Sequence, residues 1–375
     1  MDFSYSQEQR DLRDVAARMF AQRFTDEHRK AFARSGEPFD ARLWSACADA
    51  GLLGAAIGTD RGGSGLGLTE VCLMLEEQGR TLAALPLCET LLLGALPLER
   101  FGGPAQHPRL RQVLAGTLLL TAALEEPAAL DPARPGTRAE VAGEGYRLSG
   151  IKTCVPYGAQ AGYLLVSAQL AGVARVFVVA RDAPGVEVRA QRGTAGTPLA
   201  LLRLDAVAVG AQDLLGAAAA DEVLPWMLDR ARVGHCALQL GVAAEALRRA
   251  AAYTAERRQF GRPLGSFQAV QHRLADCYID VEALRSAYLR AVWALDNAVP
   301  ARAEVLAAQW WAAQCGHRVT HAVQHVHGGL GADLEYPVHA FFLRAKELEL
   351  SLGGASPTLA AIGRELQAGL VAPFT

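Results

Sequence analysis

Residues 163–168 (Tyr-Leu-Leu-Val-Ser-Ala) and 176–180 (Val-Phe-Val-Val-Ala) are two short apolar runs near the middle of the chain. Both are rich in β-branched and aromatic side chains, which is typical of strands. Three further runs share this character, at residues 146–150, 186–189 and 201–209. Turn-forming sequences such as Ala183-Pro184-Gly185 separate them. Short strands at this spacing predict an antiparallel β-sandwich or barrel in residues 119–218.

The sequence on both sides of this β-region has helical periodicity. Near the N-terminus, apolar residues at helical spacing follow Ser6 and Gln9, which predict a capping box. After Gly216, apolar residues recur every three or four positions through two long stretches. The first holds Phe267, Val270, Leu274, Cys277, Val281, Leu284, Tyr288, Val292 and Leu295, and the second Val305, Ala308, Ala312, Cys315, Val319, Ala322 and Val326. Long helices with wide apolar faces predict a bundle.

The order of these patterns predicts an α+β protein of three domains. Residues 1–118 form an N-terminal helical domain, residues 119–218 the β-domain, and residues 219–375 a C-terminal four-helix-bundle domain. A chain of 375 residues is long enough for two or three folding units. The glycine-rich loop at residues 58–67 follows no strand and carries no Lys-Ser/Thr pair, so we interpret it as a turn between helices rather than a phosphate loop.

Composition excludes several classes of function. The formal charge of −2 argues against a nucleic-acid or anionic-membrane surface as the main binding partner. The longest apolar runs, such as residues 91–98, are too short to span a bilayer. Seven scattered cysteines form no Cys-x-x-Cys pair, so neither a disulfide framework nor a metal site is predicted. With a charged N-terminus that is not typical of a signal peptide, these features predict a cytoplasmic protein.

Six groups of residues, in order and at matching spacing, resemble the acyl-CoA dehydrogenase family. They are residues 50–54 with 62–67, Glu126-Pro127, residues 148–152, residues 204–209 with 214–216, residues 256–261 with Gln268, and residues 324–331. The last two groups are the most specific, and the likeness runs through nearly the whole chain. The resemblance implies the family's helix–sheet–helix fold and dehydrogenation of a CoA thioester between Cα and Cβ. It also implies a tetramer in which each FAD lies across a subunit boundary.

The resemblance places cofactor-binding residues in the C-terminal region. Arg257 matches the arginine that pairs with the FAD pyrophosphate, where a guanidinium offers several donors to phosphate oxygens. The other positions implied to contact the cofactor are Phe260, Gln268, Gln324, Gly328 and Gly329. The two glycines would let the backbone approach the cofactor closely. This part of the family's apparatus is present.

The residues that would use the chain's own flavin are absent. The family pattern after Gly150-x-Lys152 has an aromatic residue and then a hydroxyl residue beside the flavin ring, and here these positions hold Cys154 and Pro156. A thiol cannot cover a ring face, and proline offers neither a hydroxyl nor an N–H group. The glycine- and serine-rich segment that follows Glu-Pro in the family reads Ala-Ala-Leu-Asp-Pro at residues 128–132.

The catalytic base is absent from both positions that the family uses. The usual glutamate position is Gly353, and the alternative position, directly before an arginine, is Ala231. Asp229 and Glu349 are the nearest carboxylates that could substitute. Asp229 is two residues, about 200° of helix, away from Ala231, and Glu349 precedes Gly353 by one helical turn. His235 lies near on the same helix as Ala231 and is interpreted as a core residue.

The chain keeps the residues that would bind a neighbour's FAD and lacks those that would use its own. This pattern favours a subunit that completes its neighbour's cofactor sites. The resemblance then implies an α2β2 complex with a homologous catalytic acyl-CoA dehydrogenase subunit, acting on a bulky acyl-CoA such as a steroid side chain. Electron-transferring flavoprotein is the electron acceptor that the family implies. Two alternatives stay open. One is a homotetrameric enzyme with a displaced carboxylate at Asp229 or Glu349, and the other is a non-enzymatic acyl-binding relative.

Overall fold

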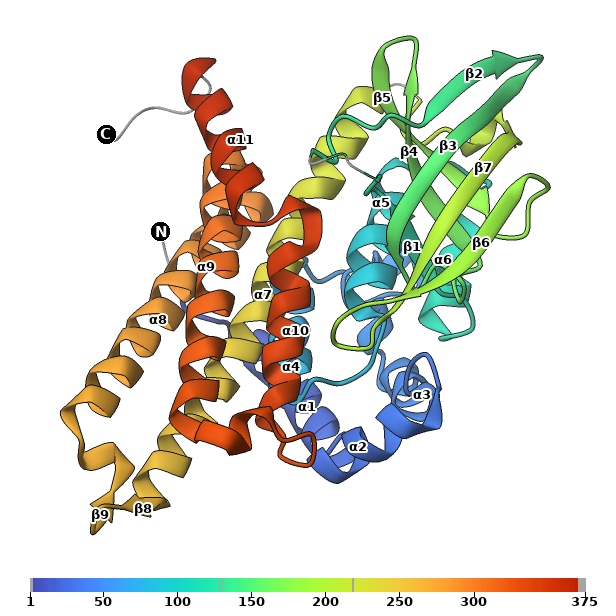
Figure 1. Ribbon diagram of the computed structural model, residues 1–375. Coiled ribbons are helices and arrows are strands. Elements are labelled where there is room, and N and C mark those ends of the chain that lie inside the picture. The colour runs from blue at the N-terminus through green and yellow to red at the C-terminus, as the bar shows by residue number, and fades with distance from the viewer. Residues whose placement is uncertain (1–2, 128, 130, 218, 370–375) are drawn as a thin grey trace. The chain divides into compact units, whose positions relative to one another are not determined.

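The computed structural model describes residues 3–127, 129, 131–217 and 219–369. These residues form two compact units, each built from segments that are separate in sequence (Figure 1). The bundle unit comprises the described parts of residues 1–31, 72–83 and 232–375. The sheet unit comprises those of residues 32–71 and 84–231. Both units therefore mix N-terminal and later segments, and three helices continue from one unit into the other.

The helices account for most of the chain. The α-helices are α1 (Gln7–Arg23), α2 (Asp26–Ser35), α3 (Ala41–Asp49), α4 (Leu68–Thr81), α5 (Leu96–Phe101), α6 (His107–Leu114), α7 (Ala220–Glu256), α8 (Gln268–Asp296), α9 (Arg302–His327), α10 (Val338–Leu350) and α11 (Ala355–Gln367). Short 3-10 turns are η1 (Leu52–Gly54), η2 (Thr59–Arg61), η4 (Ala211–Asp213), η5 (Leu264–Ser266), η6 (Gly328–Ala332) and η7 (Ser351–Gly353), and η3 (Cys88–Ala95) is a π-helix. The predicted capping box of Ser6 and Gln9 is present at the start of α1.

The strands of the sheet unit form one seven-stranded sheet. They are β1 (Leu120–Ala123), β2 (Arg138–Ala142), β3 (Gly145–Pro156), β4 (Tyr163–Leu170), β5 (Val173–Ala180), β6 (Val186–Arg192) and β7 (Pro198–Gly210). Their order is β1-β4-β2-β3-β7-β6, and β5 pairs with β4. Alternate residues of these strands bury a core that includes Leu148, Val166, Phe177 and Leu202. A separate two-stranded hairpin, β8 (Arg258–Gln259) with β9 (Arg262–Pro263), belongs to the bundle unit.

The helix–sheet–helix fold class is confirmed, and one detail of the sheet differs from the prediction. The sheet is mixed rather than wholly antiparallel, because β1 and β2 each pair with β4 in parallel. Strand composition reports burial and shape but not the direction of the neighbouring strand. The chain between β1 and β4 includes the β2–β3 hairpin. This long connection lets β4 run in the same direction as β1, which a tight turn would not allow.

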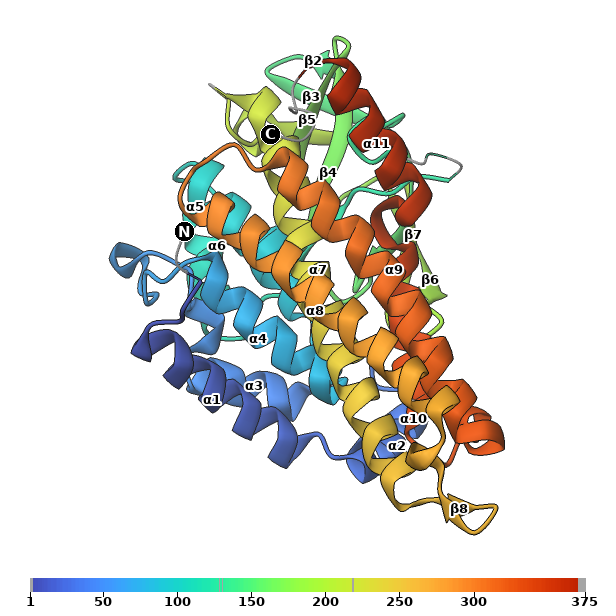
Figure 2. The same ribbon diagram turned by 90° about the vertical axis from the view of Figure 1, so that its left-hand side faces the viewer.

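Long helices pack side by side in the bundle unit (Figure 2). Helix α9 contacts α8, α10 and α11. Within the predicted apolar face of α8, Cys277 through Val292 are buried, whereas Phe267, Val270 and Leu274 near its start are only partly covered. α4 and α7 cross closely through glycines, since a β-carbon at Gly241 would lie 2.0 Å from the Glu76 carbonyl oxygen. Only glycine permits this approach of two helix backbones.

Two further predictions bear on the organisation of the chain. The domain limits at residues 118 and 218 stay a prediction. Within the segment 128–132, Ala128 and Leu130 lie outside the described residues. No helix in the described ranges combines the length and the apolar character needed to cross a bilayer.

Candidate functional site

The turn between α10 and α11 holds the position at which the resemblance expects a catalytic glutamate. Leu352, Gly353 and Gly354 have φ angles of 54°, 98° and 74°, so three consecutive residues lie in the left-handed region. A β-carbon at Gly354 would lie 2.9 Å from the Glu349 carbonyl oxygen. This backbone path suits glycine and disfavours a residue with a side chain, so a glutamate at residue 353 would be strained.

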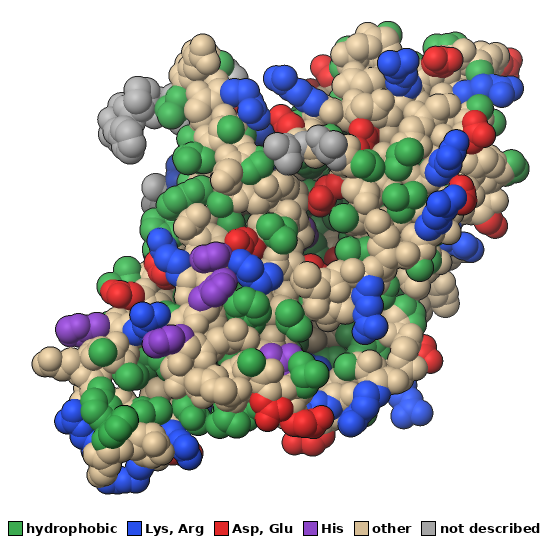
Figure 3. Space-filling model, in the orientation of Figure 1, with side chains coloured by type: hydrophobic (Ala, Val, Ile, Leu, Met, Phe, Trp, Pro, Cys, Tyr) green, Lys and Arg blue, Asp and Glu red, His purple; other side chains and the backbone are tan. Residues whose placement is uncertain are grey.

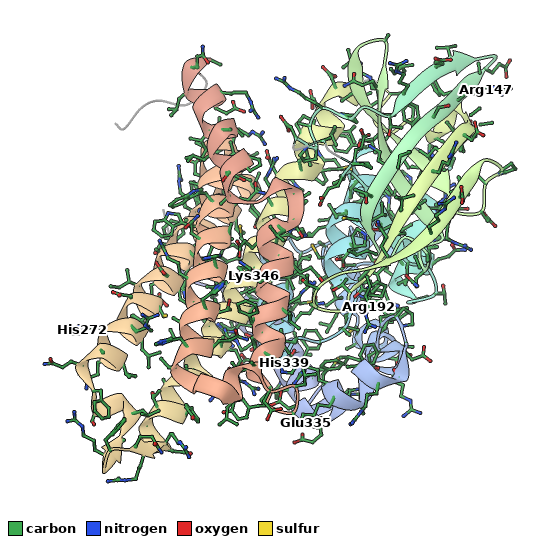
Figure 4. The ribbon with its side chains drawn as sticks, in the orientation of Figure 1. Arg147, Arg192, His272, Glu335, His339 and Lys346 are labelled. Carbon is green, nitrogen blue, oxygen red and sulfur yellow. The ribbon has the colours of Figure 1, made fainter. Side chains whose placement is uncertain are left out.

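Glu349 lies in the last turn of α10, with its carboxylate engaged by other groups. Lys346, labelled on α10 in Figure 4, donates from Nζ to Glu349 Oε2 at 2.6 Å. His317 Nδ1 of α9 lies 3.2 Å from Glu349 Oε1. α10 ends at Leu350, so Gly353 does not continue the helix above Glu349. Glu349 therefore acts in an ion pair at the surface of the bundle.

The other candidate base positions lie on α7, in the sheet unit. Ala231 is fully buried and carries no polar group. Asp229 is half-buried two residues earlier in the same helix. A role of Asp229 or Glu349 as a substitute base therefore stays a prediction.

The residues predicted to hold FAD gather at one end of the bundle unit. This end contains the β8–β9 hairpin, the start of α8 and the η6 turn after α9 (Figures 1 and 2). Arg257 and Gln268 are exposed, and Phe260 at the hairpin tip is 90% exposed with a φ of 53°. Gln324 donates from Nε2 to the Gly331 carbonyl oxygen at 3.1 Å, which ties the end of α9 to η6.

Gly328 and Gly329 lie at the surface of the same end. Gly328 has φ 61° and ψ −137°, a conformation that glycine alone takes readily. For both glycines, a β-carbon would have no heavy atom within 4 Å in the described chain. The packing of the protein therefore leaves open space over this pair, as a close backbone approach by a ligand requires.

Glu126 of the sheet unit is the centre of a buried hydrogen-bond cluster. Oε1 accepts from Lys152 Nζ at 2.6 Å and from the Thr137 backbone N–H at 2.9 Å, and Oε2 accepts from the Gly136 N–H at 2.6 Å. Burial alone would raise the pKa of Glu126, but the hydrogen bond and charge of Lys152, with those of Thr137, bring it below its usual range. Burial lowers the pKa of Lys152 to about 8, against the opposing effect of Glu126.

This cluster holds the strand that carries Cys154 and Pro156. Cys154 is exposed with a φ of 52°, and its backbone N–H donates to Gln191 Oε1 at 3.1 Å. The Pro156 carbonyl oxygen accepts from the Thr121 hydroxyl at 2.7 Å. The backbone is thus well anchored, while the side chains present a small thiol and a pyrrolidine ring. Neither side chain can cover a flavin ring, and the proline has no group that could donate a hydrogen bond to one.

A small polar pocket in the bundle unit was not predicted from the sequence. It is lined from α7 by Arg232, His235, Cys236 and Gln239, from α9 by Gln309, Ala312 and Ala313, from α10 by Leu348 and Glu349, and from the following turn by Ser351 and Gly354. Gln239 is 1% exposed, and neither of its amide atoms has a hydrogen-bond partner among the described residues. Buried polar side chains are almost always hydrogen-bonded, so this amide is an exception within the described chain.

His235 and Gln239 are held in this pocket by the packing of α7 and α9. A β-carbon at Gly316 would lie 2.2 Å from Gln239 Nε2, so the glycine makes room for the amide. Burial, and secondarily the positive charge of Arg344, lowers the pKa of His235 to about 4. The imidazole is therefore neutral at pH 7. The sequence does contain a hint of this pocket. Arg232, His235 and Gln239 are polar residues spaced three and four apart in an otherwise apolar helix, so their side chains share one helix face.

Comparison with known proteins identifies the family. Residues 6–117 match the acyl-CoA dehydrogenase N-terminal domain, and residues 222–366 match the acyl-CoA dehydrogenase C-terminal domain. The chain is 39% identical to the acyl-CoA dehydrogenase FadE27 of Mycobacterium tuberculosis, over 98% of this chain and 99% of that protein. This chain belongs to the acyl-CoA dehydrogenase family. Family membership supports oxidoreductase activity on an acyl-CoA and FAD as the cofactor.

Two solved structures show how closely this acyl-CoA dehydrogenase chain follows the family fold. It is similar to a chain of the ChsE4-ChsE5 complex from Mycobacterium tuberculosis, with a TM-score of 0.93, 38% identity and full coverage of both chains. It is also similar to a chain of the Tcur3481-Tcur3483 steroid ACAD, with a TM-score of 0.92 and 42% identity over 98% of this chain and 99% of that one.

In this acyl-CoA dehydrogenase chain, the residues at the end of the bundle unit suit FAD, whereas those on β3 do not. At the end of the bundle, an exposed guanidinium, an open aromatic ring and unobstructed glycine backbone suit a dinucleotide with a charged pyrophosphate. On β3, Cys154 and Pro156 do not suit an isoalloxazine ring. Among the described residues no three His, Cys, Asp or Glu side chains are grouped to hold a metal ion.

Proposed function

We propose that this chain is the non-catalytic subunit of a heteromeric acyl-CoA dehydrogenase. It completes the FAD site of a homologous catalytic subunit in an α2β2 complex. The observation that carries the proposal is the conformation of the turn at Gly353. Where the family's glutamate is expected, the backbone has three successive left-handed residues, a path that suits glycine and strains glutamate. General-base loss costs about 10²–10⁴ in rate, so this chain needs a partner that supplies the base.

The cofactor role of this chain lies at the end of its bundle. Arg257 would donate to the pyrophosphate oxygens of an FAD whose flavin ring belongs to the catalytic subunit. Gly328 and Gly329 would admit that cofactor close to their backbone, and Gln324, Gln268 and Phe260 would line its path. When bound, FAD accepts the hydride that leaves the β-carbon of the acyl-CoA. Arg257 also neutralises the pyrophosphate charge, which holds the cofactor in place during turnover.

The substrate that we propose is a CoA thioester with a bulky acyl group. One similar structure is described as a steroid ACAD, and the other is a complex of two named subunits. In this chain neither glutamate position carries a side chain that would occupy an acyl site, since the residues are Gly353 and Ala231. The proposed electron acceptor is electron-transferring flavoprotein.

Flavin content tests the proposal directly. The chain is purified alone and then co-expressed with a homologous acyl-CoA dehydrogenase that carries the glutamate, and bound FAD is measured by absorbance against protein concentration. We expect no FAD in the isolated chain and about one FAD for each pair of chains in the complex. One FAD per chain in the isolated protein, with dehydrogenase turnover, would contradict the proposal and favour a homotetrameric enzyme.

The two alternatives make different predictions in the same preparations. A displaced carboxylate requires that Asp229→Asn or Glu349→Gln abolish turnover, whereas our proposal expects the complex to keep its rate in both variants. Glu349 is already engaged by Lys346, which weighs against a role as base. A non-enzymatic acyl-binding protein would bind no FAD in either preparation.

A further inference from the structure

The last residue of α9 is a buried histidine. His327 is 3% exposed and directly precedes Gly328. Its Nδ1 lies 2.7 Å from the carbonyl oxygen of Val323, which can only accept, so Nδ1 carries the ring proton and donates it. Its Nε2 has no hydrogen-bond partner in the described chain. Burial lowers the pKa of His327, against the opposing effect of the bond to Val323, so the ring is neutral at pH 7.

Two tyrosine rings lie against the ring of His327. Tyr253 of α7 stacks on it, with 4.3 Å between the ring centroids and 21° between the ring planes. Tyr336, between η6 and α10, has its ring centroid 5.4 Å from that of His327 and 6.4 Å from that of Tyr253. All three distances are those of aromatic contacts. We call these three residues the aromatic cluster. Closely packed rings of this kind fix the backbone segments that carry them.

The aromatic cluster joins two segments of the proposed cofactor site. The carbonyl oxygen of Tyr253 accepts a hydrogen bond from the backbone N–H of Arg257 at 2.8 Å, one helical turn later at the end of α7. On the other side of the stack, His327 is followed by the η6 turn, which begins at Gly328. The stack of Tyr253 on His327 therefore connects the backbone that carries the arginine with the backbone that carries the glycines.

The groups that this stack connects are themselves open to a ligand. Arg257 is exposed, and a β-carbon at Gly328 or Gly329 would have no heavy atom of the described chain within 4 Å. We propose that Tyr253 and His327 are positioning residues for FAD, whose stacked rings fix the separation between the arginine and the glycine turn. Groups held at the right spacing before binding lose less freedom when the cofactor binds, which increases affinity. This inference rests on the proposed function, because it assumes that the arginine and the glycines bind one FAD.

The affinity of the assembled complex for FAD tests the positioning role without turnover. His327→Leu removes the stacked ring, whereas His327→Phe keeps an aromatic ring and loses only the nitrogen atoms. Tyr288→Leu is the matched control, because it removes a buried aromatic ring of α8, outside the aromatic cluster. Fluorescence titration of the FAD-depleted complex gives the dissociation constant, and scanning calorimetry gives the melting temperature of each variant.

We expect His327→Leu to raise the FAD dissociation constant about tenfold and His327→Phe to keep it within about twofold of the unaltered complex. Tyr288→Leu should lower the melting temperature and leave the dissociation constant unchanged. In an Arg257→Ala background, the effect of His327→Leu should become smaller, because the spacing matters less once the guanidinium is gone. If His327→Leu does not assemble, Tyr253→Leu carries the same comparison, with Tyr253→Phe as the variant that keeps the ring.

Three results would overturn the positioning role. They are an equal rise in the dissociation constant for the leucine and phenylalanine variants, an unchanged constant for His327→Leu, and an undiminished effect of His327→Leu in the Arg257→Ala background. In all three cases the unaltered complex still binds FAD, so the proposed function stands. An unaltered complex that binds no FAD would instead refute the proposed function itself.

Discussion

Nζ of Lys152 lies 2.6 Å from Oε1 of Glu126 and 2.9 Å from the hydroxyl of Ser167, with no part of the lysine side chain exposed. The carboxylate in turn accepts hydrogen bonds from the backbone N–H groups of Gly136 and Thr137, just before β2. Lys152 and Glu126 thus form a buried ion pair, and each also makes hydrogen bonds to other residues. Together these contacts join β3, β4 and the segment before β2. They hold the strand that ends in Cys154 and Pro156.

Removing one partner of this pair leaves the other charge buried and unpaired. We expect Lys152→Met to lower the free energy of unfolding by about 3–5 kcal/mol. Adding Glu126→Gln to the same protein should recover part of that loss, because the unpaired carboxylate is then gone. Urea denaturation followed by circular dichroism measures both. Additive losses in the double variant would show that the two side chains do not interact.

His235 makes stability depend on pH on the acid side. Its pKa is about 4 in the folded protein, against 6.5 for an ordinary histidine, so the unfolded chain binds more protons between these values. Stability therefore falls as the pH drops from 6.5 towards 4. Between pH 7 and pH 4.5, we expect the melting temperature of the His235→Gln variant to fall less than that of the unaltered protein. Scanning calorimetry across this range gives both curves, and parallel curves would contradict the prediction.

Restoring the family's glutamate at residue 353 should not create an enzyme. The φ of 98° at Gly353 disfavours any side chain, so Gly353→Glu should cost about 1–2 kcal/mol of stability. The isolated variant should show no acyl-CoA dehydrogenation, because Cys154 and Pro156 still do not suit a flavin. Gly363→Glu is the control, since Gly363 lies in α11 with no heavy atom within 4 Å of a β-carbon. That change should be neutral or stabilising. Turnover by Gly353→Glu alone would contradict the reasoning.

Arg257 should determine how tightly the complex holds FAD. Loss of charge-assisted hydrogen bonds to a pyrophosphate predicts a roughly 10- to 100-fold rise in the FAD dissociation constant for Arg257→Ala. Arg273→Ala, an exposed arginine on α8, should leave the constant unchanged. Fluorescence titration of the FAD-depleted complex measures both. Equal effects of the two variants would reduce the role of Arg257 to general surface charge.

Periodicity predicted most of the fold because the dominant force is burial of apolar faces. The strands at 163–170 and 198–210 and the helices at 268–296 and 302–327 all lie close to the predicted runs. β1 and β2 were not predicted, because each is short and β2 is largely exposed. The parallel pairing of β1 with β4 depends on contacts between distant segments, which no local pattern records.

The site was predictable only where single residues carry the chemistry. The absence of a glutamate at Gly353 was visible in the sequence, but the left-handed turn that surrounds it was not. Glu126 and Lys152 each belonged to a recognised segment, yet their ion pair forms only when the sheet closes. The pocket at Gln239 needs α9 and α10 to complete its wall, so one helix alone could not reveal it.

The close glycine crossing of α4 with α7 has a consequence for biosynthesis. Leu73, Met74 and Leu75 are buried in the bundle unit, whose longest segment begins at residue 232. The ribosome must therefore add well over a hundred residues after α4 before these side chains are covered. At about 5–20 residues per second, an apolar stretch made early stays open for roughly 8–30 seconds. The nascent chain in this interval is a substrate for chaperones, and slowed translation after residue 83 should increase its aggregation.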